Sequence, residues 1–423
     1  MNTVHKSNTL AWVIRSLIVC GTIVGDAHAD VLSDALAQGH AYADLRYRME
    51  SVSQDNSLKD ARASTARLQA GYESGAIDGF FANAGVQSVG VVGQDFYNST
   101  RNGLSSYATV ADPATTEVDQ LFLGYRGLPD TQFRYGRQRL QLDNERYIGN
   151  VGWRQIEQTF DATSMVNQSI PHTTITAAYL YRVHRVFGDA AGTPPGVFQS
   201  RSPLLNIAYT GLAHNKLVAY SYLIDLQNIA PTQLPAYPST RNNGLRLTGS
   251  TGLGAQGITL NYTAETALQS NGLQSPQHFL LHYSHYQLDL KDGGYQWTLA
   301  REQLGSNGQQ AFQTPLATLH AFNGWADMFL QTPVNGLIDQ YTALSATVAQ
   351  APISIIYHDF RADQGDVRYG TEIDAQATYS LTKHYTVGAA LGAYHSINTL
   401  KATSYAPATP STTKGWIWVE AKI

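Results

Sequence analysis

Segments of about ten residues in which apolar and polar side chains alternate recur along the chain. In residues 41–50 the odd positions are mostly apolar, such as Leu45 and Met49, and the even positions are mostly polar or charged, such as Arg46 and Glu50. Successive side chains of a β-strand point to opposite sides, so this period of two predicts strands with one apolar and one polar face. The same pattern recurs at 64–73, 173–184, 257–266 and 369–380.

The length of these segments suits a membrane-crossing strand. Ten residues rise roughly 33 Å, and a tilt of about 40° reduces this to about 25 Å, the height of the apolar band of an outer-membrane barrel. Strands of soluble β-sandwiches are shorter on average. We therefore predict about 18 antiparallel strands that cross a membrane. The expected strands are 40–50, 64–73, 79–88, 117–126, 131–140, 155–164, 173–184, 203–210, 216–226, 243–250, 257–266, 278–288, 293–302, 338–349, 353–360, 369–380, 384–395 and 415–423.

The connections between the expected strands mostly alternate between long and short. Residues 89–116 and 303–337 are long connections, whereas 127–130 and 350–352 are short. Short periplasmic turns and longer extracellular loops are typical of outer-membrane barrels. An even number of strands places both termini on the periplasmic side. The predicted fold is therefore all-β, a transmembrane antiparallel β-barrel with periplasmic termini in the outer membrane of a Gram-negative bacterium.

The beginning of the chain has the features of a secretory signal peptide. Lys6 and Arg15 precede a mostly apolar run over 16–24, and Ala27-His28-Ala29 supplies the small residues of a cleavage site. We therefore predict a signal peptide over 1–29 and the barrel over 30–423. The alternative for this segment is a short buried helix at the start of a cytosolic domain.

The composition changes this picture little. Charged residues make up 14% of the chain, against about a quarter in soluble proteins, and Tyr and Gly are abundant at 25 and 36 residues. The net charge of −4 gives no reason to expect nucleic-acid binding. The only cysteine, Cys20, lies in the expected signal, so we predict a mature chain without disulfides. An acylated Cys20 would make a lipoprotein, but branched Val19 stands where such sites require a small residue.

Two long blocks of sequence resemble the alginate-export family of outer-membrane porins. The first is YGRQRLQLDNERYIGNVGWRQIEQTFD over 135–161, and the second is PLATLHAFNGWAD over 315–327, which continues to Asp339. A weaker match is YGTEID over 369–374. The resemblance implies an 18-stranded monomeric barrel with an arginine-rich constriction. It does not by itself select alginate as the substrate.

Charged side chains on the polar faces are the main candidates for a functional site. A lipid-facing arginine costs roughly 2–4 kcal/mol at the membrane midplane, so strand arginines should point into the lumen. Two further arginines lie on the long connection after the fifth strand, which could fold into the pore. The alternative is that these are scattered lumen charges paired with Asp44, Glu50 and Glu73. The expected pore-lining residues are Arg46, Arg48, Arg67, Arg137, Arg139, Arg146, Arg154, Arg246, Asp44 and Glu73.

No pattern in the sequence predicts a catalytic, metal or cofactor site. His282 and His285 are spaced for a metal site on a helix, but on a strand the two rings point to opposite faces. A nucleophile elbow, a paired-histidine motif and a phosphate-binding loop are absent from the sequence. We therefore do not expect an enzyme. An outer-membrane barrel enzyme and an adhesion barrel are the alternatives outside transport.

The sequence thus predicts a porin that passes small anionic solutes through an arginine-lined lumen, with selectivity set by rings of charged side chains. Export of alginate or another acidic polysaccharide is the alternative within transport. Outer-membrane lipid and lipopolysaccharide are the other expected partners. The aromatic-rich loop 303–337 either forms a surface lid or folds inward and narrows the channel.

Overall fold

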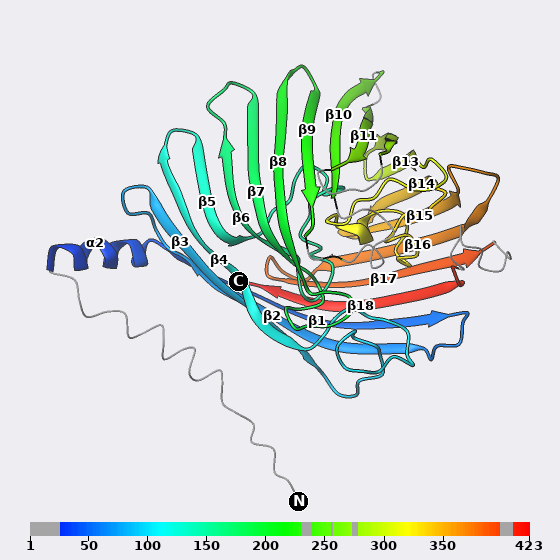
Figure 1. The fold of residues 1–423 in the computed structure, drawn as a ribbon, viewed down its shortest axis with the longest axis horizontal. Coiled ribbons are helices and arrows are strands. Elements are labelled where there is room, and N and C mark those ends of the chain that lie inside the picture. The colour runs from blue at the N-terminus through cyan, green and yellow to red at the C-terminus, as the bar shows by residue number, and fades with distance from the viewer. Residues whose placement is uncertain (1–25, 228, 230–238, 255–256, 273–277, 398–408) are drawn as a thin grey trace, which may run out of the picture.

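A computed structural model describes residues 26–227, 229, 239–254, 257–272, 278–397 and 409–423. Its strands form one 18-stranded sheet in which each strand pairs antiparallel with the next and β18 pairs with β1, so that the sheet closes into a barrel (Figure 1). The strands are β1 (His40–Gln54), β2 (Ala61–Glu73), β3 (Phe80–Val91), β4 (Thr115–Leu128), β5 (Thr131–Gln138), β6 (Thr159–Asn167), β7 (Thr173–His184), β8 (Val197–Leu212), β9 (Asn215–Asp225), β10 (Ser239–Leu253), β11 (Ile258–Asn271), β12 (Leu280–Asp292), β13 (Tyr295–Leu304), β14 (Leu337–Val348), β15 (Ala351–Arg361), β16 (Arg368–Ser380), β17 (Tyr385–Ser396) and β18 (Thr412–Lys422). The predicted fold class and every predicted strand are confirmed, and most strands extend beyond their predicted ends.

The predicted alternation of outward apolar and inward polar side chains is present in the barrel wall. On β1, Leu45 and Met49 are 52% and 50% exposed, whereas Arg46 and Arg48 are 8% and 1% exposed. The exposed residues point outward, where the apolar band of an outer-membrane barrel meets lipid. The buried residues point into the lumen. The same outward face carries many further exposed apolar side chains, among them Leu68, Leu121, Leu245, Leu288, Leu344, Ile373 and Ile417.

The strand β7 departs from strict alternation. Its register shifts between Leu180 and Arg182, which marks a bulge. Val183, which the alternation places on the apolar outer face, is instead fully buried and pairs with Phe198 in the lumen. The side chain of Arg182 is 54% exposed and lies on the outer face. The prediction was therefore wrong for Val183, because period-two counting assumes a strand without bulges.

The short turns and both ends of the described chain lie at the same end of the barrel. The helix α2 (Asp26–Ala37) precedes β1, and the carbonyl of Ala35 accepts a hydrogen bond from Gly75 in the turn between β2 and β3. The backbone of Lys422 donates to His384 in the turn between β16 and β17. This agrees with the even number of strands. The long connections, such as 92–114, 139–158 and 305–336, leave the opposite end.

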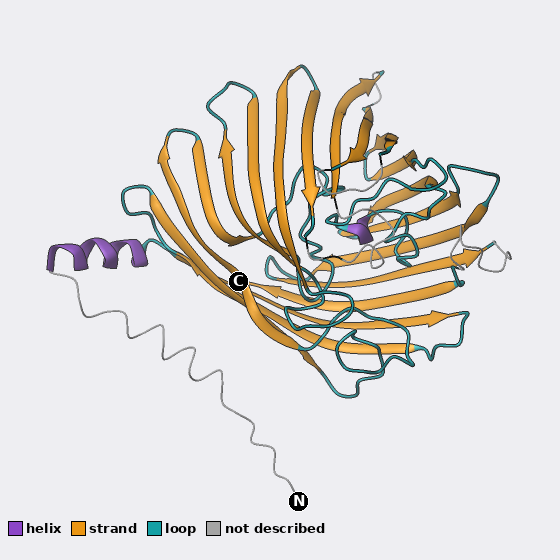
Figure 2. Cartoon of the chain, viewed as in Figure 1, coloured by secondary structure: helices purple, strands orange, loops and turns teal. Residues whose placement is uncertain are grey.

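Two of the long connections fold into the lumen, and we call residues 139–158 and 305–336 the inner loops (Figure 2). Ile148 of the first forms a parallel bridge with Leu316 of the second, and both are fully buried. Together with Phe312 they belong to a hydrophobic cluster that includes lumen-facing Tyr220 of β9 and Phe360 of β15. The second inner loop holds one short 3-10 helix, η1 (Leu319–Ala321). The main hydrophobic core of this barrel therefore lies inside its lumen.

The inner loops fill the lumen toward the long-loop end. On β10, Thr240 and Asn242 near that end are 4% and 0% exposed, whereas Thr248 is half-buried and Gly252 is exposed. An 18-stranded barrel is too wide for its wall side chains to fill. The inner loops supply the missing packing and confine any solute path in that half. Of the two alternatives for the aromatic-rich loop, the structure shows the inward fold.

The predicted signal peptide is not tested. Residues 1–25 lie outside the described residues, and α2 runs through the expected cleavage position after Ala29. In the described part of the chain, no helix is both long and apolar enough to cross a membrane. The signal peptide stays a prediction.

Candidate functional site

Arginines of β1 and β2 form a buried network on one side of the lumen. Arg48 makes an ion pair with Asp112 of the 92–114 connection and lies 3.5 Å from Glu50. Arg67 lies 2.7 Å from Asp44 and 3.3 Å from Glu420 of β18. Buried cations are tolerated where carboxylates neutralise their charge, as they do for Arg48 and Arg67. We call Arg46, Arg48 and Arg67 the arginine wall.

Arg46 is the member of the arginine wall that pairs with no carboxylate among the described residues. Its guanidinium donates to the carbonyl oxygens of Gly152 at 3.1 Å and Arg154 at 2.7 Å, and to the side chain of Gln155 at 3.1 Å. All three acceptors belong to the first inner loop. Arg46 therefore fastens this loop to the barrel wall.

The two predicted arginines of the first inner loop hold it to the rest of the lumen. Arg146 is 1% exposed and makes a 2.8 Å ion pair with Glu302 of β13. Arg154 reaches Glu50 of β1 at 3.2 Å and Asp327 of the second inner loop at 2.9 Å. Burial by itself would lower the pKa of Arg154, but Glu50, Asp327 and Asp112 raise it overall.

The Asp327 carboxylate lies beside two cationic side chains and one histidine. Lys414 Nζ of β18 lies 2.6 Å away, Arg154 lies 2.9 Å away and His320 Nδ1 lies 2.7 Å away. Burial by itself would raise the pKa of the Asp327 carboxyl, but Lys414, His320 and Arg154 hold it below its usual range. Asp327 thus remains charged and latches the second inner loop to the barrel wall and to the first inner loop.

The remaining predicted lumen residues are spread around the barrel. Arg139, at the start of the first inner loop, pairs with Glu157, and Arg246 of β10 lies 3.0 Å from Asp143 and 3.5 Å from Glu265. Glu73 lies at the short-turn end of β2 and makes no ion pair with any described residue. The structure therefore does not gather all ten predicted residues into one ring.

Arg137 does not lie in the lumen, so the prediction that it lines the pore is wrong. It pairs in register with Leu121, which is exposed on the outer face, and it follows Tyr135, which is also exposed there. The energetic argument against a lipid-facing arginine fails here because Arg137 lies beside the strand end. There its guanidinium reaches Asp161 at 3.1 Å and Asp189 at 3.4 Å instead of lipid.

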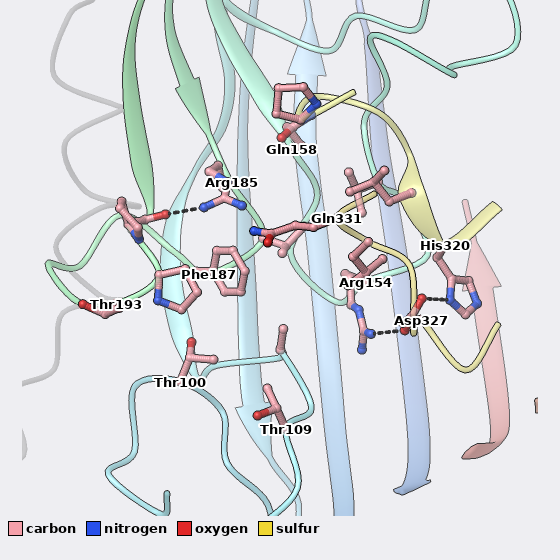
Figure 3. A pocket seen from close by; sticks show the side chains of 18 of the residues that line it. Thr100, Thr109, Arg154, Gln158, Arg185, Phe187, Thr193, His320, Asp327 and Gln331 are labelled. Carbon is pink, nitrogen blue, oxygen red and sulfur yellow. Dashed lines mark hydrogen bonds and ion pairs between the residues drawn. The ribbon is translucent and has the colours of Figure 1, made fainter. Parts of the chain in front are cut away.

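A cavity of about 1040 Å³ opens on the long-loop side of the inner loops, and we call it the mouth cavity (Figure 3). Among the described residues, its charged lining residues are Arg154, Arg185 and Lys414 and the carboxylate of Asp327. Glu50 and Asp112, which compensate the arginine wall, are 2% and 0% exposed and do not line it. The surface that a solute meets in the mouth cavity is therefore cationic, although the whole chain is net negative.

Sequence reasoning missed Arg185, Lys414 and Asp112. Lys414 lies one residue before the expected start of the last strand, and Arg185 lies one residue after the end of another. Both positions were assigned to loops, where the alternation pattern does not predict the direction in which a side chain points.

His282 and His285 lie on opposite faces, since His282 pairs with outward Leu268 and His285 pairs with lumen-facing Glu302. Among the described residues, no group of His, Cys, Asp and Glu has the arrangement of a metal site.

Comparisons with known proteins agree with the barrel. The family described as alginate export matches residues 40–187, which include the first of the two resembling blocks but not the second. No curated protein matches the chain. The solved structure of OccK9 (OpdG) from Pseudomonas aeruginosa superposes with a TM-score of 0.70 at 11% identity, covering 92% of this chain and 100% of that one. OccAB3 from Acinetobacter baumannii gives 0.70 at 13% identity, with coverage of 92% and 99%.

A third structure, OpdL from Pseudomonas aeruginosa, gives a TM-score of 0.67 at 15% identity, covering 92% of this chain and 99% of that one. At such low identity these likenesses establish the fold alone. The closed 18-stranded barrel and its outward apolar face place the chain in the outer membrane. The chain is an outer-membrane β-barrel whose residues 40–187 are similar to the family described as alginate export.

Proposed function

We propose that the barrel is a passive channel for small anionic solutes. The observation that carries this proposal is the charge of the mouth cavity, where the described lining holds Arg154, Arg185 and Lys414 but only the carboxylate of Asp327. Walls of low dielectric constant focus the field of such groups and raise the local concentration of counterions. The carboxylates of the arginine wall are buried behind this surface. They neutralise the wall without reversing the sign of the cavity.

Export of an acidic polysaccharide is the second candidate, because of the alginate export family domain. The inner loops argue against it. They are held by the buried ion pairs Arg146–Glu302 and Arg154–Glu50, and they meet each other at Ile148 and Leu316. A flexible chain many sugars long would need these contacts to break along its path. A small solute needs only the space beside them.

Swelling of proteoliposomes tests the proposal against both alternatives. Liposomes containing the purified barrel should swell faster in sodium acetate than in an isosmotic neutral sugar, while a polymeric uronate should not enter. Absence of swelling in every small solute would contradict a channel and would favour an adhesion barrel or an enzyme. Entry of the polymer at a rate comparable to acetate would instead support the export channel.

A further inference from the structure

A groove of about 600 Å³ runs across the outer face of the barrel, over the neighbouring strands β8 to β11 (Figure 1). Its outward-facing lining residues are Leu205, Ile207, Ala219, Ser221, Asn243, Leu245, Thr266 and Leu268. In one row across these strands, Leu205 and Leu268 are 40% and 41% exposed, and the shorter Ser221 and Asn243 lie between them. Short side chains between longer ones thus leave a trough that opens toward the lipid.

The floor of the groove carries a polar pair on a face that is otherwise largely apolar. Ser221 Oγ donates a hydrogen bond to Asn243 Oδ1 at 2.7 Å, and both residues are exposed on the outer face. The amide NH₂ group of Asn243 can donate to a further acceptor. A hydrocarbon chain has no acceptor for this group, whereas the oxygens of a lipid head do. The groove therefore suits the part of a lipid where acyl chains join the head.

Two arginines lie on the outer face beyond the groove, toward the long-loop end. Arg241 precedes Asn243 by two residues on the same face of β10, a rise of roughly 7 Å. Arg201 precedes Leu205 by four residues on β8, a rise of roughly 13 Å. The strands β8 and β10 flank β9, so the two side chains lie on either side of one strand. They form a cationic rim above the groove.

The charges of this rim are available to a ligand. Neither Arg201 nor Arg241 makes an ion pair with a described residue, whereas Arg182 on the same outer face lies 3.9 Å from Asp161. Asp225 ends the strand between the two arginines, but it is 2% exposed. Arginine presents two parallel N–H groups that match the oxygens of a phosphate. Basic residues at a membrane surface attract anionic lipids.

The position of the site decides which lipid it meets. The long loops of outer-membrane barrels face the outside of the cell, so the groove and its rim lie in the outer leaflet. Lipopolysaccharide, the anionic lipid expected there, carries phosphates on a disaccharide that also bears acyl chains. Its phosphates match the rim, the oxygens of its head match Asn243, and an acyl chain matches the groove.

We infer that the groove, Arg201 and Arg241 form a binding site for lipopolysaccharide. The two arginines bind the phosphates, and Asn243 donates to an oxygen of the head. One acyl chain lies in the groove between Leu205 and Leu268, where it fills the trough and gains van der Waals contacts. The site lies on the outer face of the wall, so this inference does not rest on the proposed channel.

Native mass spectrometry of the barrel with lipid A, the acylated and phosphorylated disaccharide of lipopolysaccharide, tests the site. The method counts bound lipids and separates monomers from dimers. The barrel is first refolded in detergent that contains no lipopolysaccharide. The comparison probes are phosphatidylglycerol and the phosphorylated disaccharide without acyl chains. The wild type should bind one lipid A more tightly than either comparison probe.

Two variants separate the rim from the groove. The double variant Arg201→Gln with Arg241→Gln should weaken lipid A binding about ten-fold or more, because both phosphate contacts lose their charge. Ala219→Leu fills the groove with a side chain that is acceptable on a lipid-facing surface. It should weaken the binding of lipid A a few-fold and leave the binding of the disaccharide without acyl chains unchanged.

Arg62→Gln is the matched control. It removes one exposed arginine from the outer face at the long-loop end of β2, away from β8 to β11. Its affinity for lipid A should equal that of the wild type. The heat-modifiable gel shift of each variant shows that the barrel is folded. Bound lipid A should also raise the temperature of this shift in the wild type, and less so in the double variant.

Four outcomes would overturn the site. The first is equal lipid A affinity in the wild type and the double variant. The second is a loss of affinity in Arg62→Gln as large as that in the double variant, which would indicate unspecific attraction. The third is phosphatidylglycerol binding as tight as that of lipid A. The fourth is a dimer that lipid A does not dissociate, which would mean that a second copy of the barrel covers the groove.

Discussion

The arginine wall and the connection 185–196 both place arginines out of water, but in opposite electrostatic settings. Arg48 and Arg67 are surrounded by carboxylates, and these ion pairs join β1 and β2 to β18 and to the 92–114 connection. Arg185 is surrounded by carbonyl groups and aromatic rings, and no described carboxylate pairs with it. A lumen arginine is therefore not a selectivity residue merely because it faces the lumen. Its partners decide whether it fastens the protein together or remains available to a solute.

The largest effect on stability is expected from breaking the buried ion pair between Arg146 of the first inner loop and Glu302. Arg146→Gln would leave Glu302 buried without a cation, since Arg146 is the only positive side chain that pairs with it in the described chain. Breaking a buried pair from one side costs about 3–5 kcal/mol. The temperature of the gel shift that marks unfolding should fall clearly below that of the wild type. Arg241→Gln, which removes an exposed arginine from the outer face of β10, should behave like the wild type. Equal temperatures for both variants would mean that the pair does not hold the inner loop.

A smaller effect is expected at the Asp327 latch, with a defined pH dependence. Asp327→Asn should reduce stability by about 1–3 kcal/mol, because Lys414 and Arg154 lose a charged partner. The pKa of Asp327 is depressed, so its contribution is fully present above the unfolded pKa of about 4 and is lost only as pH falls through the lower folded pKa. The stability difference between wild type and variant should therefore stay constant from pH 7 to about pH 4. A difference that already shrinks between pH 7 and pH 5 would contradict the latch.

The smallest effect on stability is expected at Arg185. Arg185→Gln removes a cation without leaving a carboxylate unpaired, so the free energy of unfolding should change by no more than about 0.5–1 kcal/mol. Chemical unfolding in detergent, followed by tryptophan fluorescence, measures this. A loss as large as that of Arg146→Gln would show that Arg185 is also a structural arginine and would remove the contrast between the two regions.

The strands of the barrel wall could be predicted from the sequence because the direction of each side chain depends on its position along its own strand. The alternation of Leu45 and Met49 with Arg46 and Arg48 reports the lipid and lumen faces directly, and strand positions followed from it. Two local departures escaped this reasoning. The bulge at Arg182 turned Val183 inward, and the strand-end position of Arg137 allowed it to face outward beside Asp161.

The arrangement of the site depends on contacts between distant parts of the chain, which no local pattern reports. Asp327 meets Lys414 and Arg154, whose positions in the sequence are far apart, only because both inner loops fold into the lumen. The sequence placed Arg146 and Arg154 on a connection that could enter the pore and offered Glu50 among the alternative partners of the lumen arginines. It did not show that Glu50 pairs with Arg154, or that Arg146 pairs with Glu302. No pattern in the sequence marked Arg185, because what distinguishes it is that no carboxylate of the described residues pairs with it.

The reversal potential in a potassium chloride gradient across a planar bilayer measures the charge preference of the channel. The wild type should give an anion-selective sign. The double variant Arg185→Gln with Lys414→Gln should move the potential toward zero, because both cations line the mouth cavity. The double variant Arg182→Gln with Arg241→Gln, which removes the same charge from the outer face, should leave it unchanged. Cation selectivity in the wild type, or an equal shift in both double variants, would contradict the claim that the cations lining the mouth cavity select the solute.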